Sequence, residues 1–210
     1  MVAYNSNLVP PTEVPRTWDD AKSTKWAGKT QNTVSGGGTP LFFAYLWSED
    51  GKTLNWEKSF SFWTELVRNT RPLVEPGFRL ERLAAGEFAL FPAAALSTTQ
   101  DFIARGAPVA IAPTGKVIGD TADIALLKNA PHPNAARLLI DWLTGPEGGL
   151  AWSDDASYLS LHPQLAHKSR INALFKSLGL TWEQLPPELG TPENQRKSLE
   201  FWLRIMTGRG

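Results

Sequence analysis

A run of glycines followed by a threonine is the strongest sign of a ligand site in this sequence. Ser35 precedes Gly36, Gly37 and Gly38, Thr39 follows them, and the apolar residues after that point recur at helical spacing. Glycine lets backbone N–H groups approach a ligand closely, and the start of a helix presents N–H donors and the positive end of the helix dipole. The pattern therefore predicts a site for a carboxylate, phosphate or sulfonate group, with hydroxyl donors from Ser35 and Thr39.

A plain surface turn is the competing interpretation of the same glycines, because an isolated Gly-rich tripeptide more often forms a turn than a site. No Gly-Lys-Ser/Thr follows, so this is not a Walker loop, and the Gly-x-Gly-x-x-Gly spacing of dinucleotide-binding proteins is missing. The residues alone leave binding and turn formation both open.

Residues suited to catalysis are scattered. His132, His162 and His167 lie in the C-terminal part, and the last two are five residues apart, which is not the spacing that places two ligands on one helical face. No serine sits in a Gly-x-Ser-x-Gly elbow, and the sequence has no cysteine. We therefore predict no enzymatic activity, no bound metal and no cofactor.

Charge and composition argue against two classes of binding partner. The 210 residues carry 21 basic and 21 acidic side chains and contain no basic run. Nucleic acid and anionic membranes both attract an excess of Lys and Arg, so neither is expected as a partner. The apolar stretches are interrupted well before the roughly 20 residues that a membrane-spanning helix requires.

Helical and strand patterns alternate from about residue 10 to residue 112, which is typical of an α/β domain. An extended stretch follows at 118–127, and from Asn134 onward every periodic segment predicts a helix. Thr17 is the expected cap of a one-turn helix. The other elements predicted before residue 113 are strands at 1–5, 88–91 and 109–112 and helices at 41–46, 56–69, 80–85 and 98–104.

Eight of the nine tryptophans divide into two groups. One group falls on helical stripes and is expected in the core, because each indole buries a large apolar area: Trp56, Trp63, Trp142 and Trp202. The other group lies near the ends of elements, where stacking on a ligand or contact with another lobe stays open: Trp18, Trp26, Trp47 and Trp152.

Seven segments of the sequence match the motif order of one known family. They are Val2–Asn5, Leu8–Pro10, Pro15–Asp20, Lys25–Lys29, Arg82–Leu90, Ile124–Ala136 and Ile140–Leu143. Together they resemble the type II extracytoplasmic solute-binding proteins of ATP-binding cassette (ABC) transporters, in the branch for ferric iron, spermidine or putrescine and related anions. The likeness covers most of residues 1–152. It implies an α/β fold: one lobe of a type II periplasmic binding protein, with a mixed sheet flanked by helices and followed by a helical C-terminal tail.

The resemblance also implies a domain organisation. Residues 1–127 would form the ligand-binding lobe with both hinge strands, and residues 128–210 a helical tail that packs on a second, missing lobe. On this mapping the chain begins at the first hinge strand, near Tyr4, and is a fragment or trimmed form of a longer protein that carries the export signal. Asn5 and Pro113 would be the hinge residues.

In this family the ligand lies in a cleft between two lobes, and the resemblance places the glycine loop there, which favours binding over a plain turn. Iron-binding members carry neighbouring tyrosines after the strand that corresponds to Phe88–Phe91, whereas Pro92–Ser97 here contains small alanines. An organic anion or another small polar solute is therefore favoured over ferric iron. The ligand-contacting residues expected from the resemblance are Tyr4, Ser35, Gly36, Gly37, Gly38, Thr39, Ala93 and Ala94.

The function implied is that of the periplasmic or extracytoplasmic component of an ABC importer, which binds a small solute non-covalently and docks on the membrane subunits of the transporter. Two alternatives stay open. The isolated lobe could act as a scaffold that forms homodimers through the surface left exposed by the missing lobe. The other alternative is ferric-iron binding.

Overall fold

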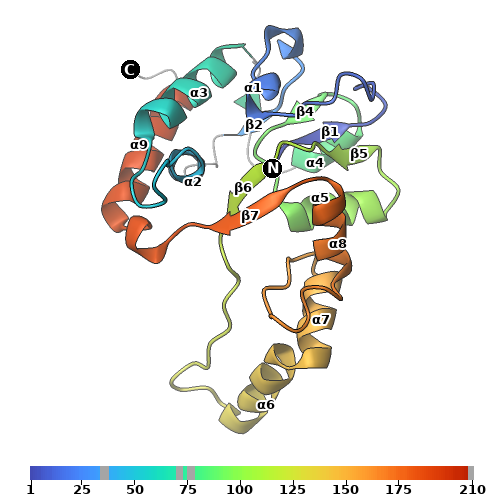
Figure 1. Cartoon of the computed structure of the whole chain (residues 1–210), viewed down its shortest axis with the longest axis vertical. Helices are drawn as coiled ribbons and strands as arrows, with labels where there is room; N and C mark the ends of the chain where they lie inside the picture. Colours follow the sequence, from blue (N-terminus) through green and yellow to red (C-terminus); the bar gives the residue numbers. More distant parts are fainter. Residues whose placement is uncertain (34–37, 70–72, 75–78, 208–210) are drawn as a thin grey trace. The chain divides into compact units, whose positions relative to one another are not determined.

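The computed structural model describes residues 1–33, 38–69, 73–74 and 79–207 (Figure 1). The chain divides into two compact units, one formed by Met1–Asp120 with Gly179–Gly210 and the other by Thr121–Leu178. Each unit contains helices that pack on one another.

The first unit contains a three-stranded antiparallel sheet in the order β4, β1, β5. The strands are β1 (Ala3–Asn5), β4 (Leu90–Phe91) and β5 (Val109–Ile111). Tyr4 of the central strand lies between Leu90 and Ala110. Because alternate residues of a strand point to opposite faces, Ala3 and Asn5 share one face and Tyr4 lies on the other.

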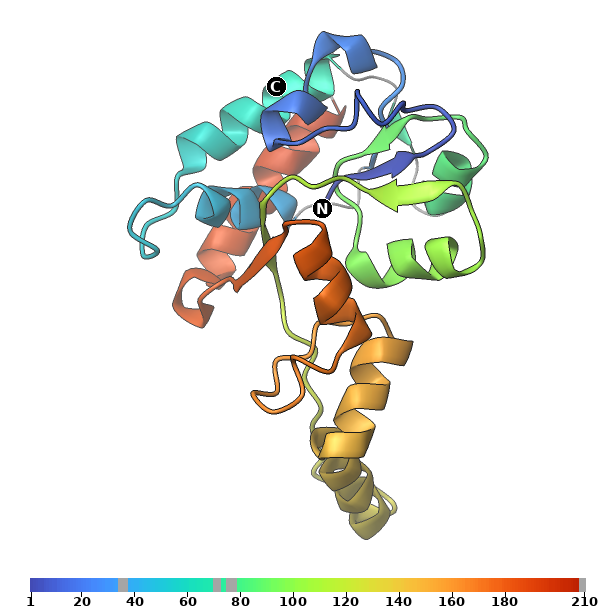
Figure 2. The ribbon, with the colours of Figure 1, turned by 45° about the vertical axis from the view of Figure 1, so that its right-hand side comes forward.

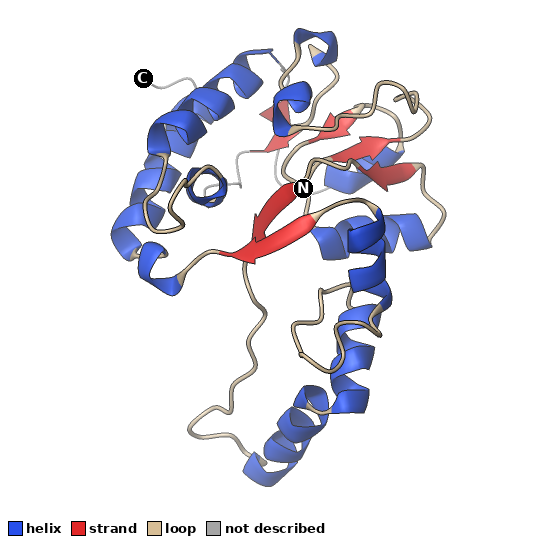
Figure 3. Cartoon of the chain, in the orientation of Figure 1, coloured by secondary structure: helices blue, strands red, loops and turns tan. Residues whose placement is uncertain are grey.

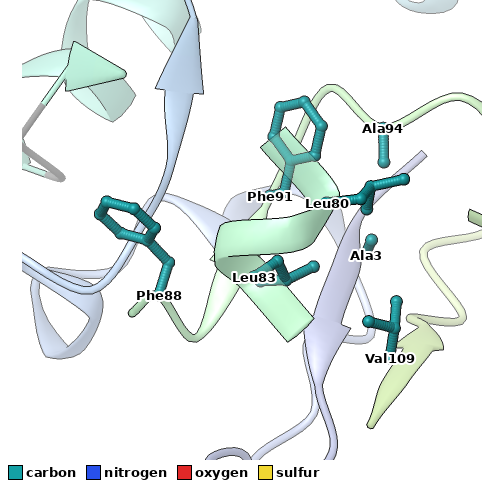
Figure 4. Packing of buried hydrophobic residues seen from close by; sticks show 7 residues of the cluster. All are labelled: Ala3, Leu80, Leu83, Phe88, Phe91, Ala94 and Val109. Carbon is teal, nitrogen blue, oxygen red and sulfur yellow. The ribbon is translucent and has the colours of Figure 1, made fainter. Parts of the chain in front are cut away.

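Two helices contribute to the apolar core beside this sheet, α4 (Arg79–Ala84) and α5 (Leu96–Ala104). Figure 4 shows the packed side chains, which come from the strands, from α4 and from the loops between them. Burying each of the larger ones contributes roughly 1.5–3 kcal/mol. The members of the cluster are Ala3, Leu80, Leu83, Phe88, Phe91, Ala94 and Val109.

Other strands of the first unit pair in parallel: β2 (Asn32–Thr33) with β3 (Leu73–Val74), and β6 (Lys116–Gly119) with β7 (Thr181–Gln184).

The first unit also contains short helices: α1 (Trp18–Ala21), η1 (Thr24–Trp26) and η2 (Pro187–Leu189). The hydroxyl of Thr17 accepts the Asp20 N–H, and the Asp20 carboxylate accepts the Thr17 N–H. The predicted cap is therefore confirmed.

An aromatic cluster joins three helices of the first unit: α2 (Thr39–Leu46), α3 (Trp56–Asn69) and α9 (Pro192–Thr207). The Trp63 ring packs edge-on against Phe43, at 4.8 Å between ring centroids, and against Trp202, at 4.9 Å. Phe60 and Phe201 stack at 3.9 Å. Aromatic pairs of these kinds add about 0.5–1.5 kcal/mol each beyond their area burial. Figure 2 shows α9, in red, running beside α3 and α2.

The expected boundary at residue 127 stays an expectation. In the structure residues 179–210 pack with residues 1–120 in the first unit. The strand β7 is an element that the sequence patterns did not predict. Four residues are too few to display a period, and the pairing that orders β7 involves β6, which lies far away in the sequence.

The second unit consists of helices and loops (Figure 3): α6 (Pro133–Thr144), α7 (Pro146–Asp155) and α8 (Arg170–Ser177). α6 and α7 approach closely at Gly148, where a Cβ atom would collide with the backbone carbonyl of Trp142. The carboxylate of Asp154 accepts hydrogen bonds from the Ser169 hydroxyl and from the N–H groups of Arg170 and Ile171. It thereby joins the end of α7 to the start of α8.

The packing of α9 predicts a large loss of stability on replacing Trp202, which is 1% exposed. Trp202→Ala should lower the free energy of unfolding by about 3–5 kcal/mol in urea denaturation, because it leaves a cavity beside Trp63. Its neighbour Leu203, which is 44% exposed, is the matched control. Leu203→Ala should cost less than about 1 kcal/mol. Equal, small effects of both changes would contradict the packing of α9 in the first unit.

The role of Asp154 predicts a pH-dependent stability. Burial acts to raise the pKa of this carboxyl, but hydrogen bonds from Ser169, Arg170 and Ile171 together lower it below its ordinary value. A lowered folded-state pKa gives stability that is present above about pH 4 and is lost as the pH falls through the folded-state value. Asp154→Asn should therefore lower protection of the α8 amides by about 1–3 kcal/mol at pH 7 and flatten the decline in acid, as measured by hydrogen exchange.

Asp155→Asn is the control for this experiment, because Asp155 is the exposed neighbour on the same helix. It should leave α8 protection within about 0.5 kcal/mol of the original chain. If both variants behaved alike, the carboxylate of Asp154 would not be what holds α8.

Candidate functional site

The amino end of α2 is the described part of the predicted glycine-loop site. Gly38 precedes the helix in a helical backbone conformation, is exposed, and has no side chain to cap the first N–H groups. Thr39 begins the helix and is half-buried. The other expected members, Ser35, Gly36 and Gly37, lie outside the described residues.

Fewer N–H donors remain at this helix end than the sequence led us to expect. Pro40 has no N–H, and the N–H of Leu41 donates to the Ser198 hydroxyl at 3.0 Å and to the Gly38 carbonyl at 3.1 Å. The Phe42 N–H donates to the same carbonyl at 3.4 Å. Thr39 therefore supplies the N–H and the hydroxyl that this end can offer to a ligand. α9 is the reason for the difference, because it contributes Ser198.

Tyr4 is half-buried on the central strand of the sheet. Burial raises the pKa of its phenol above the ordinary value, so the group stays protonated at neutral pH. A neutral phenol donates a hydrogen bond to an anion or a sugar hydroxyl, whereas ferric iron takes the deprotonated oxygen.

The two expected alanines serve mainly in packing. Ala94 is 5% exposed and belongs to the apolar cluster, and Ala93 is partly buried against that cluster. The Ala94 N–H donates to the Met1 carbonyl at 3.1 Å. Since the cluster includes Ala3, which shares a strand with Tyr4 but faces the other side, Ala94 and Tyr4 are not brought to one face of the sheet.

Asn5, one of the expected hinge residues, makes several side-chain hydrogen bonds. Its side-chain N–H₂ donates to the carbonyls of Leu83, at 2.7 Å, and Ala84, at 3.4 Å. Its side-chain oxygen accepts the Asn7 N–H at 2.9 Å. The residue is 1% exposed. Such a side chain ties β1 to α4 and makes this end of the strand a fixed point.

Pro113, the other expected hinge residue, follows β5 in a half-buried position. Thr114 beside it is 6% exposed, and its hydroxyl oxygen has no hydrogen-bond partner. Gly115 then adopts a φ of +81°, a left-handed conformation that favours glycine, before β6 begins. The backbone here is hydrogen-bonded as well, since the Thr114 N–H donates to the Ala112 carbonyl at 2.9 Å and the Gly115 carbonyl accepts the Thr181 N–H at 3.2 Å.

Gln31 is a candidate that the sequence patterns did not single out. Its N–H donates to the Leu90 carbonyl at 2.8 Å, which aligns it beside β4. The side chain is 0% exposed, yet neither its amide oxygen nor its amide nitrogen has a hydrogen-bond partner. A buried unpaired amide is costly and calls for an explanation such as a bound molecule. Only a burial pattern could have revealed it, because a single glutamine in a polar stretch is unremarkable.

Within the described ranges, no group of three or more His, Cys, Asp or Glu side chains is arranged to hold a metal ion. No helix in those ranges has the length and apolar character needed to cross a membrane.

Comparison with protein families gives one match. The model for the bacterial extracellular solute-binding proteins matches residues 1–175. No protein with curated annotation is similar enough to match.

Several solved structures share the fold. The chain is similar to the periplasmic binding protein AfuA from Actinobacillus pleuropneumoniae, with fructose-6-phosphate bound (18% identity, TM-score 0.71, 98% of this chain and 65% of that one). It is similar to the substrate-binding protein of an ABC transporter from Agrobacterium tumefaciens (14%, 0.70, 98% and 64%). It is also similar to iron-bound HitA from Pseudomonas aeruginosa (16%, 0.63, 97% and 65%).

These matches confirm two expectations, namely the resemblance to a solute-binding family and the α/β fold class of one lobe of a type II periplasmic binding protein. The chain spans slightly less than two thirds of the length of these solved structures.

The unpaired amide of Gln31 predicts opposite effects on stability and on binding. Gln31→Met removes two unsatisfied polar atoms while keeping an unbranched side chain of similar volume, so it should raise the free energy of unfolding by about 1–3 kcal/mol. It should also weaken any ligand that uses the amide by about tenfold or more. Chemical denaturation and calorimetric titration measure the two effects.

Gln164→Met is the control, since Gln164 is exposed in the second unit and should change the free energy of unfolding by no more than about 0.5 kcal/mol. A destabilised Gln31→Met variant would mean that the amide is satisfied in the folded chain.

Proposed function

Because the chain belongs to the family of bacterial extracellular solute-binding proteins, we propose that it provides the ligand-binding lobe of an ABC importer component and holds a small polar or anionic solute without covalent chemistry. The amino end of α2 is the observation that carries this proposal. Thr39 offers a backbone N–H and a hydroxyl there, next to the exposed Gly38, at the positive end of the helix dipole. The site does not require a catalytic group.

Steric access supports this position. Among the described residues, a Cβ atom built on Gly38 would meet the Phe42 ring at 3.8 Å, which is an ordinary contact distance. The backbone at the start of α2 is therefore approachable from the side of Gly38. Ser35, Gly36 and Gly37, which lie outside the described residues, stay ligand-contacting candidates on the strength of the family resemblance.

The described donors favour one class of solute. The N–H and hydroxyl of Thr39 at a dipole end suit one carboxylate or one phosphate oxygen of a larger solute. The neutral phenol of Tyr4 would then recognise a hydroxyl or amide group elsewhere on the solute. An organic anion that also carries neutral polar groups fits this set better than ferric iron does.

Transport would follow from closure of two lobes around the solute. Asn5 would be the fixed point of the motion, and the connection at Pro113 and Gly115 would absorb the change in backbone angles. The membrane subunits of the transporter would then distinguish the closed from the open form. We propose a periplasmic or extracytoplasmic location on the strength of the family.

The binding test uses the purified chain with inorganic phosphate, citrate, fructose 6-phosphate and spermidine as probes. At least one anion should raise the melting temperature. At a concentration a hundred times its Kd, it should stabilise the folded chain by about 2.7 kcal/mol. Thr39→Val, which removes the hydroxyl but keeps the shape, should weaken that anion about tenfold in calorimetric titration.

Thr64→Val is the matched control, because the Thr64 hydroxyl donates to the Phe60 carbonyl within α3, away from the proposed site. It should leave the affinity unchanged. Stabilisation by spermidine alone would overturn the choice of an anionic solute, and equal affinities for the Thr39→Val and original chains would remove the start of α2 from the site.

A further inference from the structure

Two buried serines from different helices hold one peptide group at the start of α2. The Pro40 carbonyl accepts a hydrogen bond from the Ser59 hydroxyl of α3 at 2.7 Å, and the Leu41 N–H donates to the Ser198 hydroxyl of α9 at 3.0 Å. That carbonyl and that N–H belong to the same planar peptide group. Both serines are 0% exposed, so bulk water does not compete for these hydrogen bonds. The serine clamp, meaning Ser59 and Ser198, thus fixes both polar ends of this peptide group.

Ser198 takes the place of an ordinary helix cap. An N-cap side chain usually accepts the N–H of the second or third helical residue. The N-cap of α2 is Gly38, which has no side chain, and Leu41 is the third residue of the helix. The cap is therefore supplied by α9, and the position of Gly38, where a side-chain cap would otherwise lie, is exposed.

Pro40 transmits the restraint to Thr39. The proline ring fixes its own φ at about −65°. The peptide group that follows is held by the serine clamp, so ψ of Pro40 is restrained as well. Thr39 is bonded directly to Pro40 and begins the helix. Its N–H and hydroxyl therefore extend from a backbone that is fixed before any ligand arrives.

The surroundings of the serine clamp are apolar. Ser59 precedes Phe60 and lies one turn before Trp63, and Ser198 lies one turn before Phe201 and Trp202. These rings stack or pack edge-on between α3 and α9. A hydroxyl in such surroundings costs free energy unless it is hydrogen-bonded. The two hydroxyls are thus accounted for by the peptide group of α2, since packing alone would be served by alanine.

We propose that Ser59 and Ser198 are positioning residues of the solute site, so that α3 and α9 determine how well the start of α2 binds an anion. This inference rests on the proposed role of Thr39 as the ligand donor. Because coupling between two sites is reciprocal, a solute bound at Thr39 also stabilises the contact of α2 with α9. The segment 192–207 thereby sets the affinity without contacting the solute.

Ser198→Ala tests the proposal, because it removes the acceptor and very little volume. In the ligand-free chain the amide of Leu41 should exchange with solvent about five to ten times faster, as followed by NMR, since one of its hydrogen bonds is lost. The binding probe is whichever of phosphate, citrate or fructose 6-phosphate raises the melting temperature of the original chain. Its Kd should rise about five- to tenfold in calorimetric titration.

Thr99→Val is the matched control, because the Thr99 hydroxyl is also 0% exposed in the first unit and donates to the Ala95 carbonyl at 2.6 Å, within the α5 segment. It should lower the melting temperature but leave both Leu41 exchange and the Kd unchanged. Ser198→Cys separates hydrogen bonding from packing. Its side chain has a similar shape but its sulfur is a weak acceptor, so this variant should behave like Ser198→Ala.

A Kd equal to that of the original chain in either Ser198 variant would overturn the proposal, because the hydrogen bond would then not matter for binding. Unchanged Leu41 exchange in Ser198→Ala would overturn it too. Failure of the proposed function is distinguishable from both results. In that case no anion stabilises the original chain, although Leu41 exchange still responds to Ser198→Ala, and the serine clamp serves the fold alone.

Discussion

The burial of the α9 aromatic face against α2 and α3 is the interaction on which the rest of the first unit depends. Trp63 packs between Phe43 and Trp202, and the Ser198 hydroxyl on the same face of α9 accepts the Leu41 N–H. One contact surface therefore combines apolar packing with a specific hydrogen bond. The packing fixes where α2 lies, and the hydrogen bond determines how many donors its amino end has left.

The hydrogen bond from Leu41 to Ser198 reduces the number of N–H donors at the proposed site. A helix start with every early N–H free would attract any anion, but here Thr39 is left as the donor after Pro40 and Leu41 are accounted for. On the proposed function, selectivity would come from neutral groups such as the phenol of Tyr4, whose pKa burial raises.

Local structure was predictable where a few neighbouring residues determine it. The α3 helix follows from the spacing of Trp56, Phe60 and Trp63, and the α1 cap follows from Thr17 and Asp20. Features that depend on distant partners were not predictable. β7 forms because β6 is available to pair with it, and the stripe of α9 is buried where that of α6 is exposed.

The candidate site shows the same limit. Its position on α2 was predicted, but the use of the Leu41 N–H by Ser198 and the unpaired amide of Gln31 depend on contacts across the fold.

The order of the helices along the chain has a further consequence, for synthesis on the ribosome. α3 ends at Asn69 and α9 begins at Pro192, so at roughly 5–20 residues per second the aromatic face of α2 and α3 emerges on the order of ten seconds before its cover. The nascent chain must therefore be kept from aggregating through that face. A ribosome that stalls before residue 192 would release an aggregation-prone chain in which the aromatic face of α2 and α3 is uncovered.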